Sequence, residues 1–328
     1  MDVLQQIREA IGQEMDEYLG VWLGCMHSED ALLQEVLSHV ASRRGKMMRP
    51  MLTLLSAKLC GVVNPDTLYS AVALELLHTA TLIHDDVVDE SEERRGLKSV
   101  NKLYDNKIAV LVGDYMLSLA IENVARVGNP QFKHVVARTT QELASGELLQ
   151  LKSVHNREIG EETYFRIIHR KTASLFSACA EAGALSVLSG EEQVRSLGTF
   201  GKTLGLCFQI RDDIFDYFPS SADIGKPTGN DMREGKLTLP AIHVLTAHPN
   251  EEMLSIARAV KDLSATEEEI NSLVAYTMEN GGIEYAESRM QSLAADAKAV
   301  LQPFAESADP AVYSALINYV DYSVRRTH

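Results

Sequence analysis

The sequence contains few of the residues that end helices or cross-link a chain. Only 9 of its 328 residues are proline, 6% are aromatic, and strand-like alternation of polar and apolar residues is scarce. The cysteines stand singly in apolar stretches, with no Cys-x-x-Cys pair, at Cys25, Cys60, Cys179 and Cys207. This pattern disfavours a zinc site or a disulfide framework and indicates small buried side chains in a reducing compartment.

Positive charge is also scarce. A formal net charge of −15 without a basic stripe argues against a nucleic acid partner. The N-terminus has neither the basic segment nor the long apolar segment of an export signal, so we expect a cytoplasmic protein. The most apolar window, residues 108–125, contains Asp114 and Glu122 and falls short of an uninterrupted membrane span of about 20 residues. We therefore expect no membrane span, and a helix over this window that lies centrally in a bundle.

No segment of the sequence divides it into separate domains. Apolar residues make up 45% of the chain and recur at helical spacing along its whole length, without a Pro/Gly/Ser-rich linker or a short-period repeat. A chain of this length can bury a large core. We expect one all-helical domain over residues 1–328, with a functional flap at residues 219–235, which is too long for a simple turn.

An acidic motif that occurs twice is the most informative feature present. The segment Asp85–Asp89 (Asp-Asp-Val-Val-Asp) is repeated in kind at Asp212–Asp216 (Asp-Asp-Ile-Phe-Asp). In a helix the first and last aspartates of each copy lie one turn apart on the same face, where their charges repel unless cations bind between them. Hard oxygen ligands suit Mg²⁺. One such copy is more often a solvated helix end, but two copies, each preceded by apolar sequence, predict a metal site.

Cationic residues lie near the acidic motifs, where an anionic substrate needs them. Lys46 and Arg49 are three residues apart at an expected helix start, where unpaired backbone N–H groups favour phosphate. Arg94 and Arg95 follow the first acidic motif, and the planar fork of arginine suits bidentate phosphate binding. A single cationic pair is more often a solvated surface, whereas several pairs in this order indicate phosphate binding.

These motifs, in this order, resemble those of the all-trans polyprenyl diphosphate synthases, the head-to-tail prenyltransferases. They are Glu75–Asp89 with Arg94-Arg95-Gly96, Val112-Gly113-Asp114, Lys171-Thr172, Gln209–Asp216, Gly225-Lys226-Pro227 and Gly235–Pro240. The resemblance covers nearly the whole chain. It implies an all-α isoprenoid synthase-type bundle of long helices around a deep central cavity, with the acidic motifs facing each other at its mouth. It also implies a homodimer.

The resemblance implies metal ligands residue by residue. Asp85 and Asp89 resemble the ligands of a pair of Mg²⁺ ions that grip an allylic diphosphate, and Asp212 resembles the main ligand of a further ion, which makes about three ions per active site. The remaining aspartates complete the first and second shells of ligands, namely Asp86, Asp213 and Asp216.

The resemblance also implies two diphosphate pockets and a polar pair at the reacting carbon. The residues that resemble the family's allylic diphosphate contacts are Arg94, Lys171, Lys226 and Lys236. Those that resemble its pocket for isopentenyl diphosphate are Lys46, Arg49, His78 and Arg95. Thr172 and Gln209 lie where a developing allylic cation is stabilised. With Asp85, Asp212 and Lys171 they form the implied catalytic group.

The implied reaction is repeated condensation of isopentenyl diphosphate onto an allylic diphosphate. It proceeds by Mg²⁺-assisted ionisation, condensation and proton elimination. Loss of diphosphate separates opposite charges, so the metals must neutralise the leaving group while a dry cavity protects the cation from water. The motifs contain no dedicated base, and the departed diphosphate can accept the proton.

Product length can be argued from the helix that leads into Asp85. One turn rises about 5.4 Å, close to one isoprene unit, so residues one and two turns upstream can block or admit further additions. These residues are Ala80, Thr81, Leu76 and Leu77. Short-chain relatives carry Phe or Tyr at the first pair, or an insertion in the acidic motif, and this chain has neither. We expect a long-chain product of about seven to ten units, a membrane-seeking quinone side-chain precursor.

Three alternatives compete with the long-chain synthase. A short-chain geranylgeranyl or farnesyl diphosphate synthase shares every charged motif, and product analysis separates the two. A terpene cyclase usually replaces the second acidic motif and needs no isopentenyl pocket. A regulatory subunit is expected to lose charged motifs, whereas this chain retains them.

Overall fold

The computed structural model describes residues 3–42, 45–94, 96–157, 159–218 and 228–326. Helices dominate these residues, and the strands within them are the short antiparallel pair β1 (Glu93–Arg94) and β2 (Leu97–Lys98). The prediction of an all-α fold is confirmed. Arg95, Lys226 and residues 219–227 of the expected flap lie outside the described residues.

The chain divides into two compact units. The first comprises Met1–Thr140, Leu175–Gly198 and Leu301–Asn318, and the second comprises Gln141–Ser174, Thr199–Val300 and Tyr319–His328. The first acidic motif belongs to the first unit and the second motif to the second. The expectation of a single domain over residues 1–328 stays a prediction.

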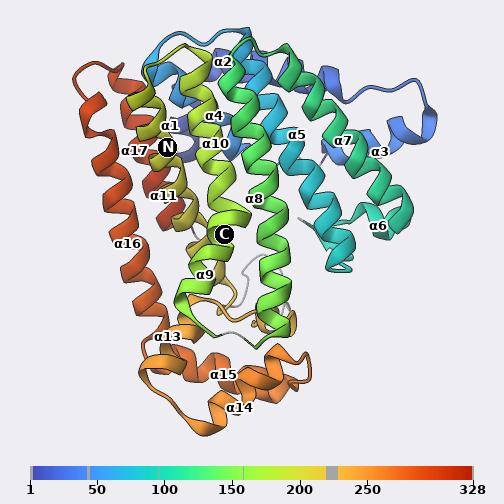
Figure 1. The fold of residues 1–328 in the computed structure, drawn as a ribbon, viewed down its shortest axis with the longest axis vertical. Coiled ribbons are helices and arrows are strands. Elements are labelled where there is room, and N and C mark those ends of the chain that lie inside the picture. The colour runs from blue at the N-terminus through green and yellow to red at the C-terminus, as the bar shows by residue number, and fades with distance from the viewer. Residues whose placement is uncertain (1–2, 43–44, 95, 158, 219–227, 327–328) are drawn as a thin grey trace. The chain divides into compact units, whose positions relative to one another are not determined.

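The first unit is built on two long helices that lie side by side, α5 (Pro65–Val88) and α7 (Asn106–Arg126) (Figure 1). The helix expected from residue 6 to residue 22 is broken into two, because α1 ends at Glu9 and α2 begins at Gly12. The other helices of this unit are α1 (Val3–Glu9), α2 (Gly12–Cys25), α3 (Ala31–Ser42), α4 (Met48–Cys60), α6 (Val100–Leu103) and most of α10 (Ser174–Ser186).

The start of α5 is fixed by its own sequence. The Asn64 side chain accepts a hydrogen bond from the backbone N–H of Thr67 at 3.2 Å, and the Thr67 hydroxyl accepts one from the N–H of Asn64 at 3.3 Å. Pro65 occupies the first turn, where its missing N–H costs nothing. Such a capping box contributes about 1 kcal/mol to helix stability. It determines where the helix that carries Asp85 begins.

The sequence-based expectation for α7 is wrong in one respect. Residues 108–125 are helical, but the helix is not central, because Leu111 is 66% exposed and Ile121 is 69% exposed. By length and composition alone α7 could cross a membrane, with 33% of its most apolar window buried. A single helix of this kind is weak evidence for a membrane protein.

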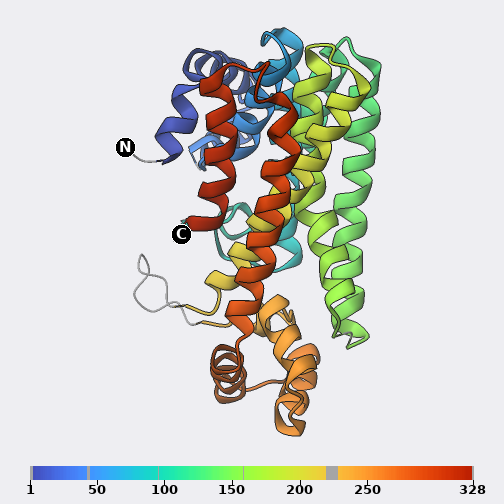
Figure 2. The same cartoon turned by 90° about the vertical axis from the view of Figure 1, so that its left-hand side faces the viewer.

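The second unit carries the second acidic motif. Three short helices, α13 (Leu239–Ala247), α14 (Glu251–Lys261) and α15 (Glu267–Glu279), gather near the end of α9 (Glu161–Ile168) (Figures 1 and 2). This unit also contains the π-helical turn η1 (His169–Ala173), α12 (Asn230–Arg233) and nearly all of α16 (Gly282–Leu301). The helices α8 (Pro130–His155), α11 (Glu191–Phe215) and α17 (Pro310–Arg325) contribute to both units, and η2 (Gln302–Phe304) belongs to the first.

Candidate active site

The first acidic motif forms the last turn of α5. The backbone N–H of Asp89 donates to the carbonyl of Asp85 at 2.8 Å, so the helical turn that places both side chains on one face is intact. Asp85 is half-buried and Asp89 is exposed. Asp86 is 2% exposed and points elsewhere, because its Oδ1 accepts a hydrogen bond from Arg94 Nε at 2.7 Å. The sequence predicts metal ligation for all three aspartates, and the structure gives Asp86 a guanidinium partner.

The turn after α5 positions Arg94 against Asp86. Glu93 pairs with Lys98 and Arg94 with Leu97 across the β1–β2 hairpin, which turns through Gly96 at a φ of 74°. This φ is favourable for glycine and strained for a residue with a Cβ. Because the hairpin brings Arg94 back over the end of α5, the buried charge of Asp86 is compensated.

A cavity of about 60 Å³ lies beside the first motif. Its lining includes His78, Asp86 and Arg94, together with Glu75 and Trp22. The sequence assigns His78 to the isopentenyl diphosphate pocket and Arg94 to the allylic diphosphate, whereas the structure places both on the lining of one cavity within the first unit. The lining thus combines the Arg94–Asp86 ion pair with the polar side chains of His78 and Glu75.

Lys46 and Arg49 flank the start of α4. Lys46 is exposed, and its carbonyl accepts a hydrogen bond from Arg8 at 3.2 Å. Arg49 is half-buried, and its guanidinium lies 4.9 Å from the centre of the Phe176 ring. Met47, at the N-cap, has a left-handed φ of 55°. The first-turn N–H groups of α4 and the two cationic side chains thus belong to one local structure, as the sequence predicts.

The residues predicted to control product length lie on another stripe of α5. Ala80 and Leu76 are fully buried, Leu77 is 2% exposed, and Thr81 is half-buried. The α5 residues that line the 60 Å³ cavity are Glu75, His78, Thr79, Leu82, Ile83 and Asp86. The role of the first four residues in chain length stays a prediction.

The glycine of the Val112-Gly113-Asp114 motif has a packing role. A Cβ atom at Gly113 would lie 2.2 Å from Nε2 of His84, which in turn contacts the carbonyl of Val110 at 3.2 Å. His84 directly precedes Asp85, so this close approach packs α7 against the end of α5 that carries the first acidic motif. Packing therefore accounts for the glycine of this motif.

The three aspartates of the second motif have three different environments. Asp212 Oδ1 accepts a hydrogen bond from a terminal nitrogen of Arg326 at 2.6 Å. Asp213 is 5% exposed, and its two oxygens accept from Tyr164 Oη at 2.5 Å and from Gln209 Nε2 at 2.8 Å. Burial raises the pKa of Asp213 to about 7. The side chain of Asp212 is 40% exposed, so its carboxylate is more accessible than that of Asp213.

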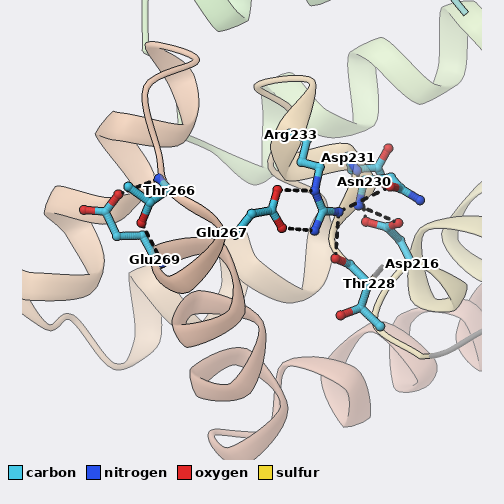
Figure 3. A network of polar contacts seen from close by, with 8 residues as sticks. All are labelled: Asp216, Thr228, Asn230, Asp231, Arg233, Thr266, Glu267 and Glu269. Carbon is cyan, nitrogen blue, oxygen red and sulfur yellow. Dashed lines mark hydrogen bonds and ion pairs between the residues drawn. The ribbon is translucent and has the colours of Figure 1, made fainter. Parts of the chain in front are cut away.

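Asp216 connects the second motif by hydrogen bonds to the segment that follows residues 219–227. Its two oxygens accept the backbone N–H groups of Asn230 at 2.9 Å and of Asp231 at 3.0 Å (Figure 3). Arg233 then grips Glu267 with two hydrogen bonds of 2.8 and 2.6 Å and reaches the carbonyl of Thr228 at 2.9 Å. This network fixes the chain immediately after the segment that contains Lys226.

Lys171 and Thr172 lie in the π-helical turn η1, a distortion that often occurs at functional sites. Lys171 Nζ pairs with Glu147 and donates to Gln150 Oε1 at 3.0 Å. The Thr172 hydroxyl donates to Gln209 Oε1 at 2.6 Å. The structure therefore brings Thr172 and Gln209 together, as the sequence predicts.

Lys236 is linked to the second motif by Asp231, which contacts both Lys236 and Asp216. Its backbone N–H donates to the Asp231 carbonyl at 2.7 Å, and its ammonium pairs with Glu234. Burial, and then the nearby charge of Asp213, raises the pKa of Asp231 well above its usual value, while Lys236 opposes that shift. Lys236 thus contributes positive charge to a strongly acidic neighbourhood.

The carboxylates present fit Mg²⁺ that is also held by a diphosphate. Among the residues that the structure describes, no three His, Cys, Asp or Glu side chains form a group that could hold a metal ion alone. Mg²⁺ usually takes one or two carboxylates and completes its shell with water and phosphate oxygens. Asp212 already pairs with a cation, the Arg326 guanidinium.

The sequence analysis missed several residues of these networks, among them Tyr164, Arg326, Asp231 and Glu147. Tyr164 contacts a residue 49 positions away, and Arg326 contacts one 114 positions away. Asp231 and Glu147 lie outside the charged motifs on which the resemblance was based. No local pattern marks Tyr164, because the π-helical turn η1 breaks the regular helical spacing between it and Lys171.

Comparison with known proteins identifies the family. A family model described as polyprenyl synthetase matches residues 30–277. The octaprenyl diphosphate synthase of Haemophilus influenzae is 32% identical over 328 residues, which covers 100% of this chain and 98% of that protein. The chain belongs to the polyprenyl synthetase family.

Solved structures of this family share the fold. The geranylgeranyl pyrophosphate synthase from Bacteroides thetaiotaomicron has a TM-score of 0.87 and 44% identity, covering 99% of this chain and 100% of that chain. A decaprenyl diphosphate synthase from Rhodobacter capsulatus has a TM-score of 0.90 and 35% identity, covering 99% of each chain. The predictions of the family, of an isoprenoid synthase-type fold and of a prenyltransferase of the long-chain type are confirmed.

Proposed function

We propose that this polyprenyl synthetase condenses isopentenyl diphosphate repeatedly onto an allylic diphosphate and releases an all-trans product of about seven to ten isoprene units. The observation that carries the proposal is the pair of acidic motifs within a family match that spans residues 30–277. Octaprenyl and decaprenyl synthases among the similar proteins support a long product. The sequence supports it as well, because the residues one turn before Asp85 are the small Ala80 and Thr81, in place of the Phe or Tyr of short-chain relatives.

The aspartates are proposed to hold Mg²⁺ together with the allylic diphosphate. Asp85, Asp89 and Asp212 are the carboxylates that bind the metal, and bound Mg²⁺ neutralises the diphosphate as it leaves. Asp213 and Asp216 instead fix the surrounding chain, because their oxygens accept hydrogen bonds from Gln209, Tyr164 and two backbone N–H groups.

The cationic residues are proposed to orient two diphosphates. Arg94, Lys171, Lys226 and Lys236 bind the allylic substrate, and Lys46, Arg49, His78 and Arg95 bind isopentenyl diphosphate. Lys171 is already paired with Glu147, so a diphosphate must share or replace that carboxylate as its partner. Thr172 and Gln209 face the carbon that ionises, and apolar walls exclude water from the cation.

A homodimer is proposed from the exposed apolar side chains of α7. Val110 and Ile121 are 11 residues apart and therefore share a face of the helix, with exposed fractions of 41% and 69%, and Leu111 beside them is 66% exposed. Apolar patches of this kind mark protein interfaces. Light scattering on the wild-type protein and on the Leu111→Glu, Ile121→Glu double variant tests it. A dimer that persists in the variant contradicts this interface.

A second candidate product is geranylgeranyl diphosphate, because the Bacteroides thetaiotaomicron synthase of that name is 44% identical over 99% of this chain. The deciding experiment incubates purified protein with Mg²⁺, labelled isopentenyl diphosphate and an allylic primer, and sizes the dephosphorylated products. Products of about seven to ten units support the proposal. A four-unit product supports the second candidate, and no prenyl product overturns both.

A further inference from the structure

A directional chain of hydrogen bonds runs from a buried tyrosine to the proposed reaction centre, within the second unit. Tyr164 Oη donates to Asp213 Oδ2 at 2.5 Å, and Gln209 Nε2 donates to Asp213 Oδ1 at 2.8 Å. Thr172 Oγ1 donates to Gln209 Oε1 at 2.6 Å. Three helical segments, α9, η1 and α11, each supply members of the chain.

The carboxylate sets the direction of this chain. Both oxygens of Asp213 accept hydrogen bonds, so Gln209 presents its amide nitrogen to Asp213 and its carbonyl oxygen to Thr172. The Thr172 hydroxyl then uses its only hydrogen on Gln209. Its oxygen lone pairs can then accept from or face another partner. Reversing the Gln209 amide would place its oxygen against the carboxylate.

Burial strengthens the polarisation. Tyr164 and Asp213 are each 5% exposed and Thr172 is 9% exposed, so little water competes for these bonds. In a dry environment each hydrogen bond polarises the next. The hydrogen bond that Gln209 donates to Asp213 therefore increases electron density on the Gln209 carbonyl, and through it on the Thr172 oxygen. Electron-rich oxygens are the groups that stabilise a developing cation.

We propose that Tyr164 is a positioning residue for the ionisation step. It holds Asp213 in the orientation that aligns Gln209, and through Gln209 it presents the lone pair of Thr172 to the allylic carbon. Tyr164 touches neither substrate. This role rests on the proposed prenyl transfer reaction, and it assigns to Asp213 the task of polarising Gln209.

The competing explanation is that the phenol of Tyr164 is a buried polar group that is merely satisfied. Tyr217 provides a matched control, because it is a buried tyrosine of the same unit, 3% exposed, whose hydroxyl lies 3.5 Å from Thr238 Oγ1. Each Tyr→Phe change deletes one buried hydroxyl. The control removes it outside the chain that leads to Thr172.

The test measures steady-state constants and the single-turnover rate of the first condensation in Tyr164→Phe, Tyr217→Phe and the wild type. We expect Tyr164→Phe to lower kcat and the single-turnover rate by about 10- to 100-fold, with both KM values changed less than about twofold. Mn²⁺ affinity, measured by electron paramagnetic resonance, should not change. Tyr217→Phe should keep a rate within about twofold of the wild type.

A double-mutant cycle separates a chain that acts as a unit from independent effects. Tyr164→Phe combined with Thr172→Val should lose little more than Thr172→Val alone, because both changes interrupt one chain. Thr172→Ser should retain the dependence on Tyr164. If Tyr164→Phe does not fold, Asp213→Asn in the same cycle tests the chain, because an asparagine has one acceptor oxygen for two donors.

Three results overturn the proposal. These are a Tyr164→Phe enzyme with wild-type kcat, equal losses in the two Tyr→Phe variants, and additive losses in the cycle. A wild-type protein that forms no prenyl product overturns the proposed function instead, and it is recognised before any variant is compared.

Discussion

Arg326, near the C-terminal end of α17, donates a hydrogen bond of 2.6 Å to Asp212, the accessible carboxylate of the second acidic motif. Its guanidinium also lies 3.8 Å from the centre of the Phe208 ring. A cation held over an aromatic face and against a carboxylate neutralises that carboxylate. Arg326 therefore competes with the metal ion that we propose for the same aspartate.

This competition predicts the behaviour of Arg326→Gln. With inorganic diphosphate present, the variant should bind Mn²⁺ or Mg²⁺ about two- to fivefold more tightly, because an ion pair with a 40% exposed carboxylate is worth only about 0–1 kcal/mol. Isothermal titration of the metal measures the change. Arg325→Gln is the control, since the structure records no ion pair from it to Asp212. Equal or weaker metal binding in Arg326→Gln contradicts the competition.

Loss of a metal-binding carboxylate should abolish turnover without unfolding the protein. Asp85→Ala and Asp212→Ala each remove an accessible carboxylate at a helix end and leave the apolar core intact. Circular dichroism should show wild-type helicity, and a product assay at saturating Mg²⁺ should show no activity. Turnover near the wild-type rate in either variant would refute the metal assignment.

The two proposed diphosphate pockets predict selective effects on KM. Lys46→Ala and Arg49→Ala should each raise the KM for isopentenyl diphosphate, with a loss of about 1.5–3 kcal/mol for one charge-assisted contact. Arg94→Ala should act more on the allylic substrate. Initial rates with each substrate varied in turn make the comparison, and equal effects on both substrates in all variants argue against separate pockets.

Ala80 provides the test of product length. Ala80→Phe places a ring one turn before Asp85, so the product should stop at roughly three or four isoprene units while the diphosphate chemistry continues. Ala80 is fully buried, and simple overpacking would instead cost about 1–3 kcal/mol without shortening the product. Chromatography of dephosphorylated products decides, and a long product from a folded, active variant shows that the growing chain avoids this position.

The buried cysteines should be unreactive in the folded protein. Burial raises the pKa of Cys179 and of Cys207 to about 12, so both thiols stay neutral at pH 8. Unfolding restores ordinary thiols, which ionise near pH 9, so their contribution to stability is present below pH 9 and is lost as the pH rises toward 12. Alkylation with iodoacetamide followed by mass spectrometry should modify the half-buried Cys25 first. Rapid native labelling of Cys179 would show that its burial is wrong.

Local features were determined by the sequence alone. The capping box joins Asn64 and Thr67, which are three positions apart in the sequence. Asp85 and Asp89 lie on the same face because they are one helical turn apart. Thr172 and Gln209 could be assigned together only because the family motif carries both. For these positions, short spacing or a known motif replaces tertiary information.

Tertiary structure decided which carboxylates are available and which are already satisfied. Nothing in Asp-Asp-x-x-Asp distinguishes Asp86, which pairs with Arg94 through a hairpin, from Asp85 before it. Likewise Tyr164 and Arg326 reach the second motif across separations of 49 and 114 residues, which no local pattern encodes. The exposed Leu111 and Ile121 of α7 make the same point for burial. Composition shows that a helix is apolar, but the packing of distant segments determines which of its faces is covered.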